Sequence, residues 1–208
     1  MGIKIAKIES LQKLIILGVN TPNFEVLTTG EEVMEFIKRG EKTRRLDTFS
    51  IRTDNKKGQA LYKKWGLPFF PNKPWGEIVD ILNKELLPLI DEKIDIIVAE
   101  GINPKDSLIS GRYLRNPKEG DILDYIRGPS TGRDVDRGSP ESWIPTSSYK
   151  KELPLHIQGQ FMRVSNYARN SFPRAFKTSF VIEFSVYPYP IGRLKDKLIF
   201  WEVIKISF

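Results

Sequence analysis

Apolar residues recur at intervals of three and four positions in two stretches near the start of the chain, as on one face of an amphipathic helix. The first stretch covers residues 9–17 and the second covers residues 29–40. Thr29 and Glu32 of the second stretch make a capping box, in which two side chains satisfy free backbone donors at a helix start. The sequence therefore predicts two N-terminal helices, the second ending at Gly40 behind the cations of its last turn.

Several other stretches either alternate apolar with polar residues or are apolar throughout, and both patterns are typical of β-strands. The expected strands are residues 24–27, 48–53, 94–99, 108–114, 122–126, 180–186 and 198–206. The last two are expected to form an antiparallel pair. A further helix is predicted at residues 78–86, with Pro88 as its limit, and a short helix is predicted around Leu61 and Trp65.

Residues 66–74 contain three prolines and favour a break in regular structure. We predict a division there, with a smaller N-terminal lobe at residues 1–70 and a larger C-terminal lobe at residues 71–208. The expected fold class is α+β, with two unequal lobes and a mostly antiparallel sheet in the larger lobe. A single compact α/β unit without a cleft is the alternative.

The chain has no cysteine, which excludes disulfides, thiolate nucleophiles and the usual structural zinc sites. Its single histidine, His156, excludes a multi-histidine metal centre, and its apolar neighbours are more typical of a strand than of a catalyst. No segment suits a membrane span or a secretory signal, so we expect a cytoplasmic protein without a membrane partner. The abundance of Ile, Lys and Arg is also a feature of thermophile proteins.

The 33 lysines and arginines outnumber the 26 acidic residues, which gives the 208-residue chain a net charge of +7. Such an excess favours anionic partners, which include nucleotides, phosphorylated metabolites, nucleic acid and acidic membrane surfaces. Charge that serves solubility alone is the alternative. A partner therefore has to be inferred from particular segments.

One candidate segment is a phosphate-binding loop. Residues 128–134 read GPSTGRD, and their glycines and hydroxyls together with Arg133 could place backbone N–H groups and a fixed cation around a phosphate. The segment is not a Walker A loop, because the Gly-Lys-Ser/Thr sequence is missing. A plain surface turn explains the same residues.

Two glutamates lie within the predicted C-terminal strand pair. Glu183 and Glu202 each have apolar neighbours, and an ionised carboxylate on an apolar face is costly unless a cation compensates it. Mg²⁺ prefers hard oxygen ligands and is often held by one or two carboxylates together with substrate phosphates. The pair is a candidate magnesium site; a salt bridge to an arginine, or an edge strand with that face in water, is the alternative.

Residues 161–177 interleave basic and aromatic side chains, which suits single-stranded nucleic acid through stacking and charge neutralisation. A loop with its aromatic rings packed inward and its arginines in water is the alternative. A basic RNA- or DNA-binding module without catalytic activity is therefore the rival function. Its contact residues would be Arg163, Tyr167, Arg169, Phe172 and Arg174.

Four parts of the sequence resemble the nucleotide-binding domain of the ATP-grasp superfamily, in particular its phosphoenolpyruvate synthase and pyruvate phosphate dikinase branch. They are LIILGVNTPNFEV at 14–26, FSIRTD at 49–54, IVAEG at 97–101, and the pair FVIEFSV and LIFWEVI at 180–186 and 198–204. The resemblance implies an ATP-grasp fold that binds a nucleotide between its lobes. It places Arg52 at the nucleotide phosphates, Glu100 near the base and Glu183 at the metal. Glu202 falls at the position of a family glutamine.

The expected function is binding of ATP with Mg²⁺. Whether the chain also carries out ATP-dependent ligase or phosphotransferase chemistry is left open by the sequence. Arg52 and Arg133 would contact the phosphates, Glu100 would lie near the base, and Glu183 with Glu202 would hold the metal. Such chemistry needs no cysteine or catalytic histidine, because the protein mainly positions phosphates and neutralises their charge. A domain of this kind can bind nucleotide without being a complete enzyme.

Overall fold

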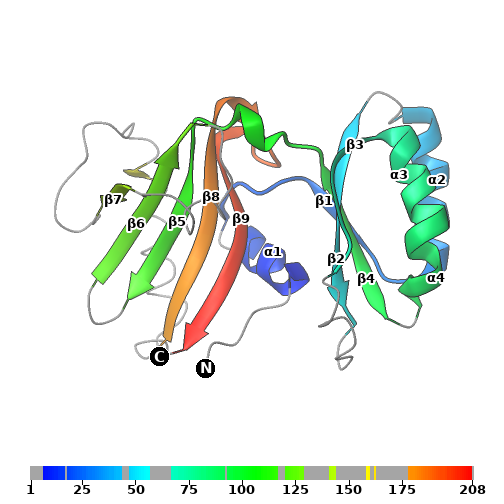
Figure 1. Cartoon of the computed structure of the whole chain (residues 1–208), viewed down its shortest axis with the longest axis horizontal. Coiled ribbons are helices and arrows are strands. Elements are labelled where there is room, and N and C mark those ends of the chain that lie inside the picture. Colours follow the sequence, from blue (N-terminus) through cyan, green and yellow to red (C-terminus); the bar gives the residue numbers. More distant parts are fainter. Residues whose placement is uncertain are drawn as a thin grey trace. The chain divides into compact units, whose positions relative to one another are not determined.

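The structure is a computed structural model that describes residues 7–16, 18–43, 47–56, 67–91, 93–116, 120–128, 141–143, 158–159, 162 and 178–207. The chain forms two compact units, both visible in Figure 1. The larger unit comprises Met1–Thr21 and Pro104–Phe208, and the smaller unit comprises Pro22–Asn103. The predicted α+β fold of two unequal lobes is confirmed, and the chain crosses between the units twice.

The structure divides the chain elsewhere than at the predicted boundary. Residues 66–74 lie inside the smaller unit, where Phe69–Pro74 forms β3 at the edge of a sheet. An edge strand tolerates proline, because one of its sides has no ladder to which an N–H must donate. Pro71 and Pro74, which contributed to the predicted boundary, therefore belong to a paired strand.

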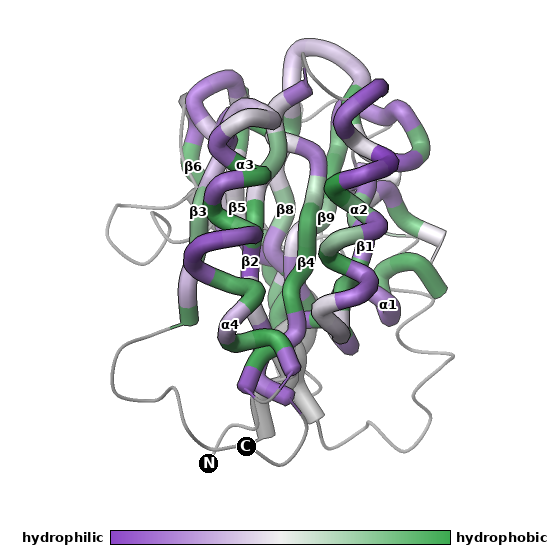
Figure 2. The backbone as a smooth tube through the Cα atoms, turned by 90° about the vertical axis from the view of Figure 1, so that its right-hand side faces the viewer, coloured by the Kyte–Doolittle hydropathy of each residue, from purple (hydrophilic) through white to green (hydrophobic). Residues whose placement is uncertain are grey.

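The smaller unit is a four-stranded antiparallel sheet with helices over one face (Figure 1). Its strands are arranged in the order β1-β4-β2-β3. Apolar and polar segments alternate along its helices in Figure 2, and the apolar sides share a core with the strands. Its elements are β1 (Phe24–Leu27), α2 (Gly30–Thr43), β2 (Thr48–Asn55), β3 (Phe69–Pro74), α3 (Trp75–Ile81), the π-type turn η1 (Leu82–Leu86), α4 (Leu87–Ile90) and β4 (Ile94–Glu100).

Two helical segments extend beyond their predicted ends. α2 continues through Gly40 to Thr43, and the helical run that begins with α3 passes Pro88 and ends at Ile90. Pro88 falls in the first turn of α4, where a missing N–H is tolerated. The wider turn of η1 precedes it and accommodates the change in hydrogen bonding.

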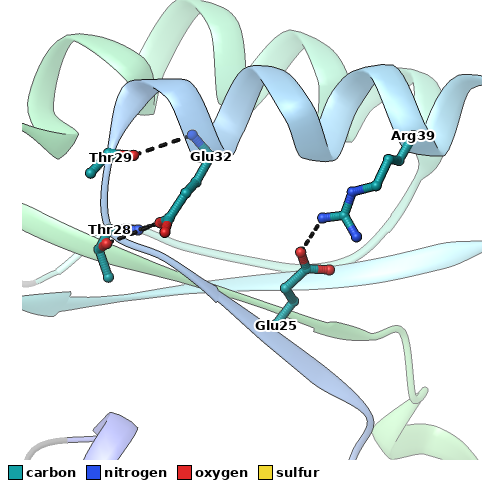
Figure 3. A network of polar contacts seen from close by, with 5 residues as sticks. All are labelled: Glu25, Thr28, Thr29, Glu32 and Arg39. Carbon is teal, nitrogen blue, oxygen red and sulfur yellow. Dashed lines mark hydrogen bonds and ion pairs between the residues drawn. The ribbon is translucent and has the colours of Figure 1, made fainter.

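The start of α2 has the predicted cap, shown in Figure 3. Thr29 Oγ1 accepts a hydrogen bond from the backbone N–H of Glu32 at 3.2 Å. The Glu32 carboxylate accepts from the backbone N–H and the hydroxyl of Thr28, at 2.6 and 2.9 Å. The backbone hydrogen bond from Thr28 is the main cause that lowers the pKa of Glu32 below its usual value. Further along α2, Arg39 forms an ion pair with Glu25 of β1.

Three aromatic rings connect the helices of the smaller unit to its sheet. Phe36 of α2, Phe49 of β2 and Trp75 of α3 are buried, with ring centroids 5.6 to 6.5 Å apart. Gly40 lies one helical turn after Phe36, and a Cβ atom there would fall 2.1 Å from Trp75 Cη2. The close approach of the indole ring therefore requires glycine at this position.

Gly40→Ala is expected to lower the free energy of unfolding by about 1–3 kcal/mol, because the added methyl group overlaps a buried ring. Urea denaturation followed by tryptophan fluorescence measures the change. Gly76→Ala in α3 is the matched control, since a Cβ atom at Gly76 has nothing within 4 Å. It should leave stability unchanged or raise it by up to about 1 kcal/mol through helix propensity. Equal effects of the two substitutions would contradict the packing argument.

The larger unit is built on a five-stranded antiparallel sheet with the strand order β7-β6-β5-β8-β9. One face packs against Leu14 of α1 in a core that includes Tyr113, Tyr125, Phe184 and Phe200. No helix within the described ranges is long and apolar enough to cross a membrane. The elements are α1 (Lys7–Ile16), η2 (Pro104–Asp106), β5 (Ile109–Asn116), β6 (Gly120–Arg127), β7 (Glu141–Trp143), β8 (Thr178–Ile191) and β9 (Asp196–Ser207).

Candidate functional site

Four charged side chains form a row across the sheet of the larger unit. The strand register pairs Arg112 of β5 with Asp124 of β6 on one side and with Glu183 of β8 on the other. Glu183 in turn pairs with Glu202 of β9. Directly paired residues of neighbouring strands project to the same face, and their chain neighbours fill the core on the α1 side. The structure therefore brings Glu183 and Glu202 together on the opposite face.

Glu183 has an arginine partner that the sequence analysis missed. Arg112 Nη2 lies 3.4 Å from Glu183 Oε1, and the two side chains have only 19% and 17% of their area exposed. This contact agrees with the salt-bridge alternative for Glu183, so any function of that carboxylate has to include the ion pair. The sequence does show a charged residue, Arg112, within the predicted strand at residues 108–114. Its partner could not be predicted, because it depends on the order of the strands in the sheet.

Glu202 differs from Glu183 in its polar contacts. Its Oε1 atom is buried and has no hydrogen-bond partner among the residues that the structure describes. A buried carboxylate oxygen without a donor is costly, and two carboxylates directly opposite each other also repel. A cation between or beside them would remove both costs.

The donor set fits a hard divalent cation that also binds phosphate oxygens. Two carboxylates are a usual protein contribution to a Mg²⁺ site, with the remaining positions taken by water and substrate phosphates. Within the described ranges no group of three or more His, Asp or Glu side chains could hold a metal ion. The pair of Glu183 and Glu202 is thus suited to a metal that a phosphate ligand helps to hold.

Arg52 lies on β2 of the smaller unit, on the sheet face without helices. Its chain neighbour Ile51 belongs to the core on the helix side of the sheet. Because successive side chains of a strand point to opposite faces, Arg52 points away from that core. Arg52 pairs with Ile97 of β4 and Phe69 of β3, and its guanidinium carbon lies 5.2 Å from the centre of the Phe69 ring. Stacking of this kind restricts the orientation of the guanidinium.

Glu100 ends β4 and lies on the other face of the same sheet. It pairs with Phe49, whose ring belongs to the helix-side core. Its Oε2 accepts hydrogen bonds from the backbone N–H of Asn23 at 3.1 Å and from the Asn23 side-chain amide. The structure thus does not bring the side chains of Arg52 and Glu100 together, because residues on opposite faces of a sheet point apart.

The remaining predicted residues lie outside the described ranges. They are Arg133 of the phosphate loop, His156, and the nucleic-acid candidates Arg163, Tyr167, Arg169, Phe172 and Arg174. Phosphate binding by Arg133 and nucleic-acid binding therefore stay predictions from the sequence.

No protein-family model matches the sequence, and no curated protein matches it by sequence. The fold of the chain is similar to that of several solved structures. ACD1 of Ca. Korarchaeum cryptofilum, solved with coenzyme A, has a TM-score of 0.58 and 12% identity, over 99% of this chain and 93% of that one. D-Alanine-D-alanine ligase from Helicobacter pylori has a TM-score of 0.56 and 11% identity, over 96% of this chain and 53% of that one.

The ADP complex of PurK, N5-carboxyaminoimidazole ribonucleotide synthetase, has a TM-score of 0.52 and 9% identity, over 96% of this chain and 44% of that one. The chain therefore spans about half the length of the ligase and of the synthetase. At such low identities the likeness concerns the fold alone. Together with the two antiparallel sheets and their helices, it confirms that the chain has an ATP-grasp fold.

Proposed function

We propose that the chain binds ATP together with Mg²⁺ and supports ATP-dependent ligase chemistry. The observation that carries the proposal is the carboxylate pair, in which Glu183 lies opposite Glu202 and one Glu202 oxygen is buried without a donor from the described residues. The fold supports the choice of nucleotide, since two similar structures are named as a ligase and as a synthetase with ADP. The net charge of +7 also suits an anionic ligand.

In this proposal Glu183 and Glu202 hold the metal, and Arg112 orients the Glu183 carboxylate through their ion pair. Arg52 and Arg133 are the proposed phosphate contacts. When bound, Mg²⁺ neutralises charge on the phosphate oxygens.

Glu100 borders the base in the same proposal. Asn23 donates twice to its carboxylate, so we assign this carboxylate to fixing the end of β4 and not to proton transfer. The backbone at this end of β4 is fixed as well, since the Glu100 N–H donates to Asn23 O at 2.8 Å and the Gly101 N–H to Thr48 O at 2.7 Å. These bonds hold the end of β4 rigid.

A complete ligase reaction goes beyond the fold, because the chain spans about half the length of D-alanine-D-alanine ligase and of PurK. Phosphotransferase chemistry, and the phosphoenolpyruvate synthase and pyruvate phosphate dikinase branch of the superfamily, stay predictions from the sequence. Ligase and phosphotransferase reactions both start from bound Mg-ATP, so one binding experiment tests the step that they share.

Millimolar Mg-ATP is expected to raise the melting temperature, because a ligand that binds only the folded state stabilises it. At a concentration of about 100 times Kd the gain is about 2.7 kcal/mol, which differential scanning calorimetry resolves. The control is ATP with EDTA, which should give a much smaller shift. The proposal fails if Mg-ATP produces no shift or if EDTA leaves the shift unchanged.

A further inference from the structure

Strand β9 contains one residue more than β8 next to the carboxylate pair. Glu183 pairs with Glu202, whereas the following residue Phe184 pairs with Phe200. Trp201 is therefore the extra residue of a β-bulge. Bulges of this kind bend the strand and change the direction of the side chains around them.

The bulge decides which face of the sheet Glu202 occupies. A regular register continued from the pair of Phe184 and Phe200 would place Glu202 opposite Ile182. Ile182 is fully buried in the core on the α1 side, so the carboxylate would then point into apolar packing. The extra residue moves Glu202 to the face of Glu183 instead.

The side chain of Trp201 is fixed by a buried serine. Its indole Nε1–H donates to Ser185 Oγ at 2.9 Å, and Ser185 Oγ lies 2.8 Å from Ser110 Oγ. Ser185 and Ser110 are 3% and 0% exposed. The indole of Trp201 is half-buried, and it cannot turn away without losing this bond to a buried acceptor. The hydrogen bond thus holds the bulge residue on the face that carries Glu183.

The outer edge of β9 fixes the same bulge from the other side. The backbone N–H of Phe200 donates to Asn20 O at 2.9 Å, and the N–H of Val203 donates to Ser10 Oγ at 2.5 Å. These two outward N–H groups are three residues apart, whereas a regular edge strand turns every second N–H outward. The bulge at Trp201 is therefore held by hydrogen bonds at the strand edge and by the indole hydrogen bond on the face of the sheet.

We propose that Trp201 and Ser185 are positioning residues for the metal-binding carboxylates. Their hydrogen bond fixes the bulge and thereby directs Glu202 toward Glu183. Neither side chain carries a charge with which to hold the cation, so both act through Glu202. This role rests on the proposed function, and it explains why a costly bulge lies directly beside the paired glutamates.

The test is an electron paramagnetic resonance titration of the full chain with Mn²⁺ in place of Mg²⁺, carried out both without ATP and with ATP present. Trp201→Phe keeps an aromatic side chain and the extra residue but removes the N–H, and Ser185→Ala removes the acceptor. Each change is expected to weaken Mn²⁺ binding by about tenfold or more, as for other partners that orient metal ligands. Binding of ATP in EDTA is expected to change little, since the metal takes no part in it.

Ser107→Ala is the matched control. Ser107 is also a buried serine of the hydroxyl chain, since its Oγ lies 3.4 Å from Ser110 Oγ and donates to Pro104 O at 2.8 Å. Its loss should destabilise the larger unit without weakening Mn²⁺ binding. A metal-free readout is the indole N–H of Trp201 in nuclear magnetic resonance, which should exchange slowly in the wild type and faster in Ser185→Ala.

Each outcome has a distinct meaning. Wild-type Mn²⁺ binding that stays unchanged in Trp201→Phe and Ser185→Ala would overturn the positioning role and leave the proposed function intact. Equal weakening in Ser107→Ala would also overturn it, because general destabilisation would then explain the loss. A wild-type chain that binds Mn²⁺ neither alone nor together with ATP would overturn the proposed function and the positioning role with it.

Discussion

Glu202→Gln is expected to abolish the Mg-dependent part of ATP binding and to leave the unliganded protein at least as stable as the wild type. Glutamine keeps the shape of the side chain but removes the charge that a hard cation needs. The affinity should fall by more than the roughly 10–100-fold typical of residues that only orient a metal ligand. Calorimetric titration of ATP with and without Mg²⁺ measures this loss.

The expected apo stability follows from the surroundings of Glu202. Its Oε1 is buried without a donor among the residues described, and Glu183 lies directly opposite. The charge is therefore a cost to the unliganded fold, so its removal should leave the melting temperature unchanged or raise it. A clear fall in apo stability would show that Glu202 has a structural partner instead.

Glu183→Gln is the comparison variant, and its expected effect on the apo protein has the opposite sign. The change leaves the mostly buried Arg112 without the full charge of its partner, which should cost about 1–3 kcal/mol. Asp124 remains opposite Arg112 and limits the loss. Both glutamine variants should lose Mg-dependent binding. If Glu183→Gln is strongly destabilised yet its folded fraction still binds Mg-ATP, Glu183 is a structural residue and not a metal ligand.

The local parts of the fold could be predicted because their signals are short in sequence. Alternation predicted β8, an apolar run predicted β9, and the short linker between them predicted their antiparallel pairing. Thr29 with Glu32 predicted the start of α2. The C-terminal end of α2 could not be predicted, because Gly40 normally ends a helix and its place inside α2 depends on the packing of Trp75 from another helix. The prolines of β3 led to a wrong boundary for the same kind of reason. A strand tolerates proline when it lies at the edge of a sheet, and the sequence does not show that β3 lies there.

The carboxylates of the candidate site were visible as charges in apolar strands, whereas their relations were not. The ion pair of Arg112 with Glu183 requires β5 to lie next to β8, although the two residues are 71 positions apart. Arg52 and Glu100 were both assigned to one nucleotide, yet the register of β2 with β4 places them on opposite faces of a sheet. Strand order and register depend on contacts distant in sequence, and a single sequence does not display them.

The membership of residues 1–21 in the larger unit is also a long-range effect, and Asn20 is its main polar anchor. Asn20 Nδ2 donates to Ile191 O and to Leu198 O, both at 2.9 Å, and its Oδ1 accepts from Leu194 N–H at 2.7 Å. The residue is 4% exposed. A single side chain therefore satisfies backbone groups on both sides of the β8–β9 turn. Gly192 is the first residue of this turn and has a φ of 74°.

Asn20→Asp is expected to lower the free energy of unfolding by about 3–5 kcal/mol, because it sets a buried carboxylate against carbonyl oxygens that had an amide donor. The substitution keeps the size and the acceptor, so a loss reports the missing donor and the added charge. Asn72→Asp, the same change at an exposed residue, is the control and should stay within about 0.5 kcal/mol of the wild type.

Hydrogen exchange monitored by mass spectrometry locates the effect of Asn20→Asp. Protection should fall in α1, at the β8–β9 turn and along the edge of β9, where Phe200 N–H donates to Asn20 O. The smaller unit should keep its protection, since its core contains no residue of the first 21. Uniform loss of protection in both units would mean that they unfold as one cooperative body. Stability equal to the wild type would show that the apolar contacts of Leu14 hold residues 1–21 in place without Asn20.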